Sequence, residues 1–254
     1  MIDSHTHLYF PEFHEGIADV INLSVSSGVS HFILPNVDEE SLPQMKDFHS
    51  RYPAVTSMAI GLHPTEVKED WGRVMETFHE DLKTGKYVAV GEVGIDLYWS
   101  KDFIKEQKIA FEHQIRLAEN YKLPVIIHSR QAFNETMEVI EKVKPTVPLI
   151  FHSFTGSKAD VERIRKGSDP FFGINGVVTY KNANELREAI PEIGLDRIVL
   201  ETDSPYLTPV PHRGKQNNSS YLCHIRDKVA ETLNITPEEV ETITDQNCKA
   251  IFKI

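Results

Sequence analysis

The sequence predicts an α/β fold, specifically a (β/α)8 TIM barrel, and three observations support this fold class. The chain has 254 residues, a length that suits one α/β barrel. Eight short apolar runs alternate with longer amphipathic segments along it. Side chains that can bind metal ions stand at the carboxyl ends of five of these runs. No linker or low-complexity stretch interrupts the alternation, so we expect a single domain over residues 1–254.

Each apolar run is rich in Val, Ile and Phe and is bounded by turn residues, a pattern typical of buried parallel strands. Pro124, Pro148 and Pro170 stand at the start of a run, where the missing N–H group does least harm. Eight parallel strands close a barrel, although the same alternation also permits an open doubly wound sheet. The runs are residues 1–8, 31–37, 55–63, 87–95, 124–129, 148–153, 170–178 and 197–204.

The segments between the runs carry helical patterns. The clearest is residues 101–121, whose apolar side chains recur at spacings of seven, four and three and so share one helix face. The tail 218–247 is also helical in pattern, and Thr236 followed by Pro237 is a helix start signal within it. The other expected helices are residues 39–51, 66–84, 131–143 and 157–167.

Composition excludes several classes of protein. The formal net charge of −11 argues against a general nucleic-acid binder, because phosphate groups favour a basic surface. No apolar run approaches the roughly 20 residues of a membrane span, and the first residues do not resemble a secretory signal, so we expect a cytoplasmic protein with no membrane partner. The two cysteines cannot form a disulfide framework or a thiolate zinc site.

Histidine is abundant, with 12 residues, and several histidines follow the apolar runs directly. His5 and His7 are two residues apart, so on a strand both side chains would point the same way. The carboxyl ends of barrel strands converge on one face, where active sites lie. A metal centre there would satisfy polar groups that otherwise cost about 1–3 kcal/mol each when buried without a partner. The expected metal ligands are His5, His7, Glu92, His128, His152 and Asp203.

Six ligands with two carboxylates are too many for one tetrahedral zinc ion, and they suit two ions about 3.5–4 Å apart with a bridging carboxylate. We expect His5, His7 and Asp203 on one ion, His128 and His152 on the other, and Glu92 on both. Imidazole and carboxylate ligands are compatible with Mg, Mn or Zn and do not decide among them.

These residues lie in motifs that resemble those of the TatD-family metal-dependent deoxyribonucleases, which belong to the amidohydrolase-like barrels. The resemblance spans nearly the whole chain, and ETDSPYL followed by PHRGK is its most specific part. Gln131 stands where an acidic residue is common, but no departure touches the six expected ligands. The motifs are DSHTHL (3–8), GLHP (61–64), GEVGIDLYW (91–99), LPVIIHSRQAF (123–133), FHSFTGS (151–157), LETDSPYLTPVPHRGK (200–215) and NCKAIF (247–252).

The resemblance implies divalent-metal-dependent hydrolysis of phosphodiester bonds in DNA, with nucleotides removed from the 3′ end. It also places Glu92 where amidohydrolase relatives often carry a carbamylated lysine. Two cations would bind the scissile phosphate and lower the pKa of a water molecule. Asp203 would orient that water and accept its proton, so Asp203 and Glu92 are the expected catalytic residues.

Cationic and aromatic side chains near the ligands are expected to contact the substrate. These residues are His63, Arg130, Tyr206, Arg213 and Lys215. Asp96 and Glu201 are expected to orient ligands or to pair with Arg197 or Arg130, and Glu201 also shares a strand face with Asp203.

Two other functions remain open at this point. An amidohydrolase-type C–N or ester hydrolase acting on a small molecule would use the same two ions, although the basic PHRGK loop favours phosphate. A non-catalytic barrel that serves as a binding module is the third possibility, and the intact set of six ligands argues against it. No feature of the sequence indicates self-association, so we expect a monomer.

The acidic average charge is compatible with a local DNA site. No Asp or Glu occurs from Ser204 to Arg226, a stretch that contains three basic residues and directly follows Asp203. Two divalent cations facing two carboxylates would leave the centre positive. We therefore expect DNA to be held through a few phosphate groups at one end and not along its length.

Overall fold

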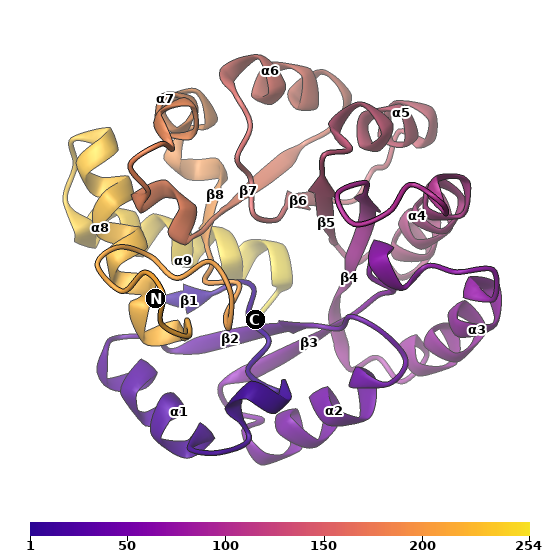
Figure 1. Cartoon of the computed structure of the whole chain (residues 1–254), viewed down its shortest axis with the longest axis horizontal. Helices are drawn as coiled ribbons and strands as arrows, with labels where there is room; N and C mark the ends of the chain where they lie inside the picture. Colours follow the sequence, from indigo (N-terminus) through magenta and orange to yellow (C-terminus); the bar gives the residue numbers. More distant parts are fainter.

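The chain folds into one eight-stranded parallel sheet, which confirms the predicted α/β barrel. The computed structural model describes residues 1–254. The strands follow one another in sequence order, and each pairs in parallel with the next (Figure 1). They are β1 (Ile2–Asp3), β2 (His31–Pro35), β3 (Thr56–Ile60), β4 (Tyr87–Asp96), β5 (Val125–Arg130), β6 (Leu149–Phe151), β7 (Pro170–Ile174) and β8 (Ile198–Leu200).

Backbone hydrogen bonds beyond the ends of β8 and β1 link the last strand to the first. The Ser4 N–H donates to the carbonyl of Leu200, and the Asp203 N–H donates to the carbonyl of His5, both at 2.9 Å. Thr6 forms an isolated parallel bridge with Ser204. The sheet is therefore a nearly closed barrel, and the open doubly wound alternative is wrong.

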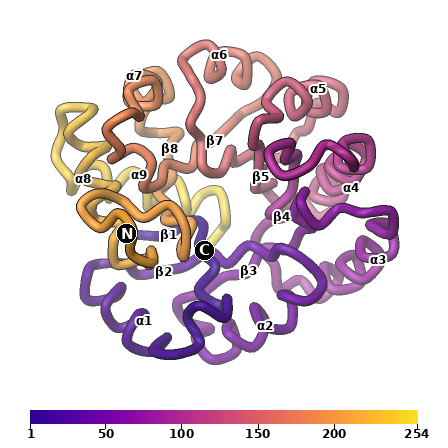
Figure 2. The backbone as a smooth tube through the Cα atoms, viewed as in Figure 1, coloured from indigo at the N-terminus to yellow at the C-terminus, as the bar shows by residue number.

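Helices surround the barrel and cover the outer face of the sheet (Figures 1 and 2). None of them combines the length and the apolar character that crossing a membrane requires. The α-helices are α1 (Ile17–Ser26), α2 (Ser41–Arg51), α3 (Trp71–Leu82), α4 (Ile104–Tyr121), α5 (Phe133–Val143), α6 (Lys158–Gly167), α7 (Asn184–Ile193), α8 (Leu222–Leu233) and α9 (Pro237–Phe252). Short 3-10 helices are η1 (Pro11–Phe13), η2 (Pro64–Glu66), η3 (Gly176–Thr179), η4 (Leu195–Arg197) and η5 (Ser219–Tyr221).

The C-terminal helical segment consists of two helices and not one. α8 ends at Leu233, and the next residue, Asn234, has a left-handed φ of 55° that stops the helix. α9 begins as the sequence predicts, with Thr236 as its cap: the hydroxyl accepts the Glu239 N–H, and the Glu239 carboxylate accepts the Thr236 N–H.

Most of the strands are shorter than their apolar runs, and two of these differences affect the site. β1 ends at Asp3, so the expectation that His5 and His7 lie on a strand is wrong. The chain stays beside residues following β8 through the bridge at Thr6, and this keeps both histidines at the barrel mouth. β7 ends at Ile174, and the rest of that run turns into η3.

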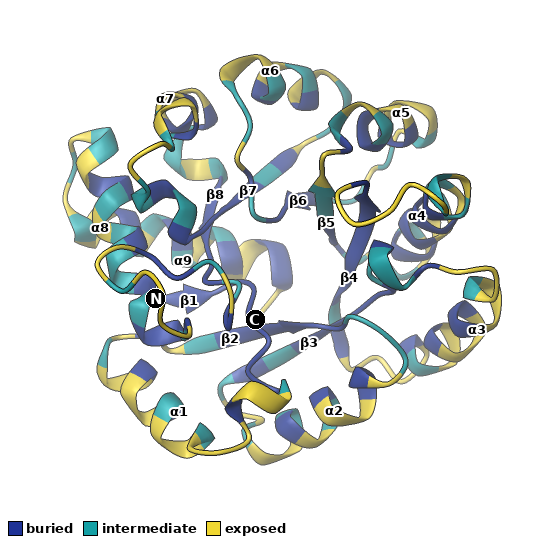
Figure 3. Ribbon diagram, viewed as in Figure 1, coloured by how far each residue is buried: buried dark blue, intermediate teal, exposed yellow.

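The barrel interior is a small apolar core separate from the larger one between sheet and helices. Side chains of α9 belong to this core and close it at the amino ends of the strands. Figure 3 shows that the strands around it are largely buried. Ile126, Ile150 and Val199 belong to this core. Two residues further along the chain, in β5 or directly after β6 and β8, stand His128, His152 and Glu201. Because strand side chains alternate, this spacing points all three polar groups into the barrel mouth. The interior core residues are Ile2, Ile33, Ala59, Ala89, Ile126, Ile150, Val199, Cys248, Ile251 and Phe252.

Candidate metal centre

A cavity of about 670 Å³ opens at the carboxyl ends of the strands. Five of the six expected ligands line it, and His5 lies fully buried beneath it. The floor is polar although it is largely withdrawn from solvent, and Glu92, His5 and His7 are all buried. Buried polar groups at this density require partners, and the distances between them show which partners are available.

The first group of donor atoms lies between β1, β4 and β8. His5 Nε2 is 3.1 Å from Glu92 Oε2 and 3.7 Å from Asp203 Oδ1. His7 Nε2 is 3.8 Å from Glu92 Oε2 and 3.7 Å from Asp203 Oδ1. The two imidazole nitrogens are 3.2 Å apart. His5, His7 and Glu92 thus meet the distance requirement for holding one ion, and Asp203 stands beside them.

The second group surrounds the other oxygen of the same carboxylate. Glu92 Oε1 is 2.7 Å from His128 Nδ1 and 3.5 Å from His152 Nε2. It is also 3.5 Å from His63 Nε2. The two oxygens of Glu92 therefore face two separate sets of histidine nitrogens, as a carboxylate that bridges two ions would. The irregular register of β4 between Val90 and Val93 accompanies this inward placement of Glu92.

The donor set fits a metal cation because its histidines offer lone pairs. Burial lowers the pKa of His7 to about 4 and holds the pKa of His5 well below its usual value, so both rings are neutral at pH 7. The Tyr9 hydroxyl donates to the carbonyl of Pro35 at 2.6 Å, and it lies 3.2 Å from His7 Nδ1. That hydroxyl can therefore accept the Nδ1 proton, which leaves the Nε2 lone pair of His7 facing the carboxylates.

Two buried carboxylates stand behind the other histidines. Asp96 Oδ2 is 2.9 Å from His128 Nε2, and Glu201 Oε1 is 2.9 Å from His152 Nδ1. Each carboxylate favours a proton on the nitrogen it contacts and so frees the opposite nitrogen toward Glu92. The sequence left two roles open for Asp96 and Glu201, orienting ligands or pairing with an arginine. The distances favour the first role, and neither carboxylate pairs with Arg130 or Arg197.

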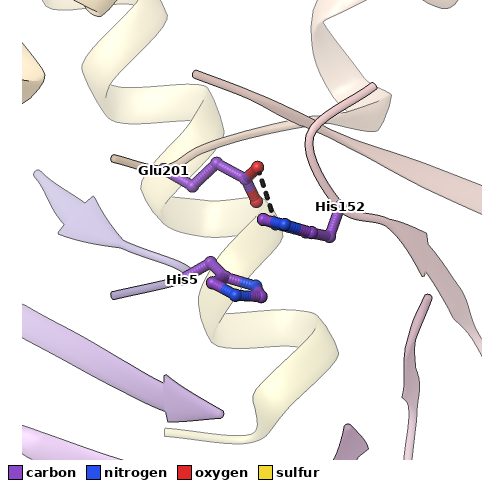
Figure 4. Close-up of side chains that lie close together, drawn as sticks. All are labelled: His5, His152 and Glu201. Carbon is purple, nitrogen blue, oxygen red and sulfur yellow. Dashed lines mark ion pairs between the residues drawn. The ribbon is translucent and has the colours of Figure 1, made fainter. Parts of the chain in front are cut away.

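His5, His152 and Glu201 also lie close enough together to suggest a third ion (Figure 4). Ring stacking argues against it, since the two imidazoles lie parallel within 19° at 3.6 Å between centres. Lone pairs of stacked rings point in parallel directions and do not converge on one ion. We therefore assign Glu201 to orienting His152. Gly173 makes room for it, because a Cβ there would lie 2.2 Å from Glu201 Oε2.

His63 differs from the other histidines in its hydrogen bonding. Its Nδ1 lies 2.7 Å from the Thr65 hydroxyl oxygen and 3.3 Å from the Thr65 backbone nitrogen, so Thr65 engages this side of the ring. Nε2 lies 3.3 Å from His128 Nδ1. Distance alone would allow His63 to join Glu92 and His128 around an ion. Thr65 holds the Nδ1 side of the ring, and His63 lines the cavity.

The electrostatics of the centre also call for cations. Burial opposes charge on His152, yet Glu201, Glu92 and Asp203 together raise its pKa to about 10. Burial and the neighbouring carboxylates raise the pKa of Asp203 to about 7. Burial disfavours the charge of Glu92 as well, but the surrounding histidines hold its pKa well below its usual value. In the metal-free centre, bound protons therefore supply the positive charge that metal cations would otherwise supply.

Comparison with known proteins identifies the family. The family model for TatD-related DNases matches residues 2–253. The chain belongs to this TatD family. It is 34% identical to YabD of Bacillus subtilis, an uncharacterised metal-dependent hydrolase, with 100% of this chain and 99% of that one covered. It is 30% identical to YcfH of Escherichia coli K12, also an uncharacterised metal-dependent hydrolase, with 100% of this chain and 96% of that one covered.

The solved structures agree with this assignment. The structure of YJJV, a TatD homologue of Escherichia coli K12, superposes with a TM-score of 0.93 at 26% identity, covering 100% of this chain and 98% of that one. The resemblance on which the sequence analysis relied is thus confirmed. The protein is a member of a family of metal-dependent hydrolases, and His and Glu groups able to bind metal are present in it.

In this TatD-family barrel the expected substrate residues lie in two places. His63, Arg130 and Tyr206 line the metal cavity. Arg213 and Lys215 do not, and they line a neighbouring cavity of about 470 Å³. Leu207 lines both cavities.

Four aromatic or polar residues near the centre were missed by the sequence analysis. Tyr9, two positions after His7, follows the same spacing that marks the His pair and so carried a detectable signal. Thr65, Tyr98 and Tyr180 act through loop geometry, for which the sequence offers no spacing rule.

Proposed function

We propose that the protein is a divalent-metal-dependent nuclease that hydrolyses phosphodiester bonds of DNA, removing nucleotides from the 3′ end. Two ions, of Mg, Mn or Zn, would occupy the centre. The observation that carries the proposal is the position of Glu92, whose two oxygens face two separate sets of histidine nitrogens. Family membership supports the hydrolase, and the DNA substrate is our proposal.

Divalent cations held here would supply Lewis acidity and lower the pKa of a water molecule. Asp203 suits the role of proton acceptor, because its side chain is 14% exposed whereas that of Glu92 is only 4% exposed. Asp203 thus faces the cavity, where a water molecule and a phosphate can reach it.

The positive groups at the cavity wall suit a phosphate substrate. His63 lines the cavity with its Nδ1 engaged by Thr65, and in the tautomer that carries the proton on Nε2 it can donate to a non-bridging phosphate oxygen. Arg130 lines the same cavity and has no carboxylate partner, so its guanidinium edge remains available for bidentate contact with phosphate. Tyr206, which is half exposed, lies at the same wall and offers a ring face to a base.

The experiment is hydrolysis of end-labelled DNA by protein stripped of metal and reloaded with Mg, Mn or Zn. We expect metal-dependent release of the 3′ label as mononucleotide. Asp203→Asn and His5→Ala should lose at least about 100-fold in rate. Asp196→Asn, whose side chain is 79% exposed beside Arg197, is the matched control and should keep full activity.

Assays with substrates of other classes distinguish the nuclease from the alternative functions. Failure on both DNA and RNA, with turnover of an amide or lactone, would establish the small-molecule hydrolase instead. Release of internal fragments without loss of the 3′ label would retain the nuclease and reject the exonuclease. Metal binding with no turnover of any of these substrates would indicate a binding module.

A further inference from the structure

Two arginines of the chain have guanidinium groups that contact neither a carboxylate nor a carbonyl oxygen, and both lie near the metal cavity. Each is stacked on a tyrosine: Arg130 lies 3.8 Å from the ring centre of Tyr98, and Arg213 lies 3.9 Å from that of Tyr180. The other eight arginines are engaged by acidic side chains or by carbonyl groups. Stacking fixes the guanidinium plane and leaves its N–H edges free for an anion.

Arg213 and Lys215 line a cavity that adjoins the metal cavity. Leu207 is part of the wall of both cavities, so the two cavities are neighbours. Tyr180 forms a further part of the second wall. Lys215, like Arg213, has no ion-pair partner, and no acidic residue occurs in the loop from Ser204 to Lys215.

This loop is held firmly to the catalytic end of the barrel. Asn217 is fully buried, and its side-chain amide donates to the carbonyls of Thr202 at 2.9 Å and Tyr206 at 2.6 Å. Thr208 Oγ1 donates to the carbonyl of Lys215 at 2.6 Å. The orange segment between β8 and α8 accordingly follows one compact path beside the N-terminal chain (Figures 1 and 2). The loop therefore holds Arg213 and Lys215 at a fixed position relative to Asp203.

The loop also depends on Gly176 for its path. A Cβ at Gly176 would lie 2.0 Å from the carbonyl oxygen of Leu207, so only glycine allows the two segments to pack this closely. Tyr180, four residues further on, is thereby brought under Arg213, and its hydroxyl donates to the carbonyl of Thr208 at 3.2 Å. The stacked pair is thus built from two segments that are pinned together.

We propose that Tyr180, Arg213 and Lys215 form a separate subsite for a further backbone phosphate of single-stranded DNA, beside the cavity that holds the scissile phosphate. This inference rests on the proposed function. An unpaired guanidinium and an ammonium group select a phosphodiester, and the tyrosine holds the guanidinium in place. The subsite would make longer strands better substrates than a dinucleotide.

The test compares substrate lengths. A dinucleoside monophosphate has only its scissile phosphate, whereas an octanucleotide can reach both cavities. We expect Arg213→Gln to raise KM about 3- to 10-fold for the octanucleotide and to leave the dinucleotide unchanged. Lys249→Gln removes an equally exposed, unpaired charge from α9 at the opposite end of the barrel, and should change neither. An equal penalty at both lengths, or none, would overturn the subsite.

A binding measurement separates this inference from the proposed function. Anisotropy of a 5′-labelled octanucleotide is followed with the Asp203→Asn protein, with and without Arg213→Gln, across a salt series. We expect Arg213→Gln to weaken binding and to reduce the slope of log K against log salt by about 0.7, the value for one phosphate contact on a single strand. Tyr180→Ala removes the ring under Arg213 and should behave like Arg213→Gln, whereas Tyr180→Phe keeps the ring and should weaken binding less.

Together, the binding and hydrolysis measurements test the subsite and the nuclease function separately. Hydrolysis of DNA without any effect of Arg213 on binding or KM rejects the subsite alone. Binding that depends on Arg213 without hydrolysis rejects the nuclease and retains the phosphate subsite. Neither binding nor hydrolysis rejects both.

Discussion

Glu201 Oε1 lies 2.9 Å from His152 Nδ1, and the same oxygen accepts the Ser153 N–H at 2.6 Å. Both side chains are almost completely buried. The second oxygen, Oε2, has no hydrogen-bond partner at all. A buried carboxylate with an unsatisfied oxygen lowers the stability of the fold. We therefore infer that the charge of Glu201 next to His152 contributes to the function of the centre.

Replacing Glu201 by Gln tests whether this charge contributes to metal binding, because the substitution preserves the side-chain volume and removes the charge. Burial opposes protonation of His152 and Glu201 is the largest charge that favours it, so Glu201→Gln should lower the pKa of His152 from its value near 10. We expect metal affinity to fall about 10- to 100-fold by titration calorimetry. Glu192→Gln, at the exposed end of α7, is the control, and unchanged affinity in Glu201→Gln would contradict the role.

The Tyr9 hydroxyl is predicted to set the tautomer of His7. Tyr9→Phe removes only the oxygen that lies 3.2 Å from His7 Nδ1, so the proton can shift to Nε2 and compete with a cation. Metal affinity should drop by about 10-fold, with little change in the urea midpoint of the metal-free protein. Tyr87→Phe also removes a buried hydroxyl, one without a hydrogen-bond partner at the opposite end of β4, and should leave metal binding as it is.

Metal binding should release protons, in a number that depends on pH. With Asp203 near pKa 7 and His152 near pKa 10, the metal-free protein holds a proton on both groups at pH 6 and only on His152 at pH 8.5. Because cations displace these protons, affinity should rise with pH over this interval. Although burial opposes it, Asp96 and Glu92 also raise the pKa of His128, which adds a further proton at pH 6, so calorimetry in buffers of different ionisation enthalpy should give more protons released at pH 6 than at pH 8.5. A number that does not change with pH would contradict this account.

Much of the centre could be predicted because strand geometry is local. A histidine two residues beyond an interior apolar side chain must point into the barrel, and His128 and His152 obey this rule. The orientation of the lone pairs could not be predicted. It depends on contacts with Tyr9 and Thr65, which follow from the path of loops. The separation of Arg213 from the metal cavity has the same origin.

The sequence analysis did not predict α1 and α7, and each contains residues that are unusual in a surface helix. α1 exposes Leu23 and Val25, so its solvent face resembles its buried face. α7 contains Pro191 within the helix, a residue that normally ends one. Packing on the barrel overrides both local signals, and sequence periodicity does not report tertiary packing.

Gly173 offers the sharpest test of how the backbone of β7 supports the centre. A Cβ at this position would lie 2.2 Å from Glu201 Oε2 and 2.6 Å from its carboxyl carbon, so Gly173→Ala must displace the carboxylate that orients His152. We expect a loss of about 1–3 kcal/mol in the free energy of unfolding of the metal-free protein, together with weaker metal binding. Gly72→Ala is the matched control, because nothing lies within 4 Å of the added methyl group and its position in α3 favours alanine. Urea titrations in chelator should therefore show Gly72→Ala unchanged or more stable. Equal behaviour of the two variants would mean that Glu201 can move without cost, which would remove the reason for glycine at position 173.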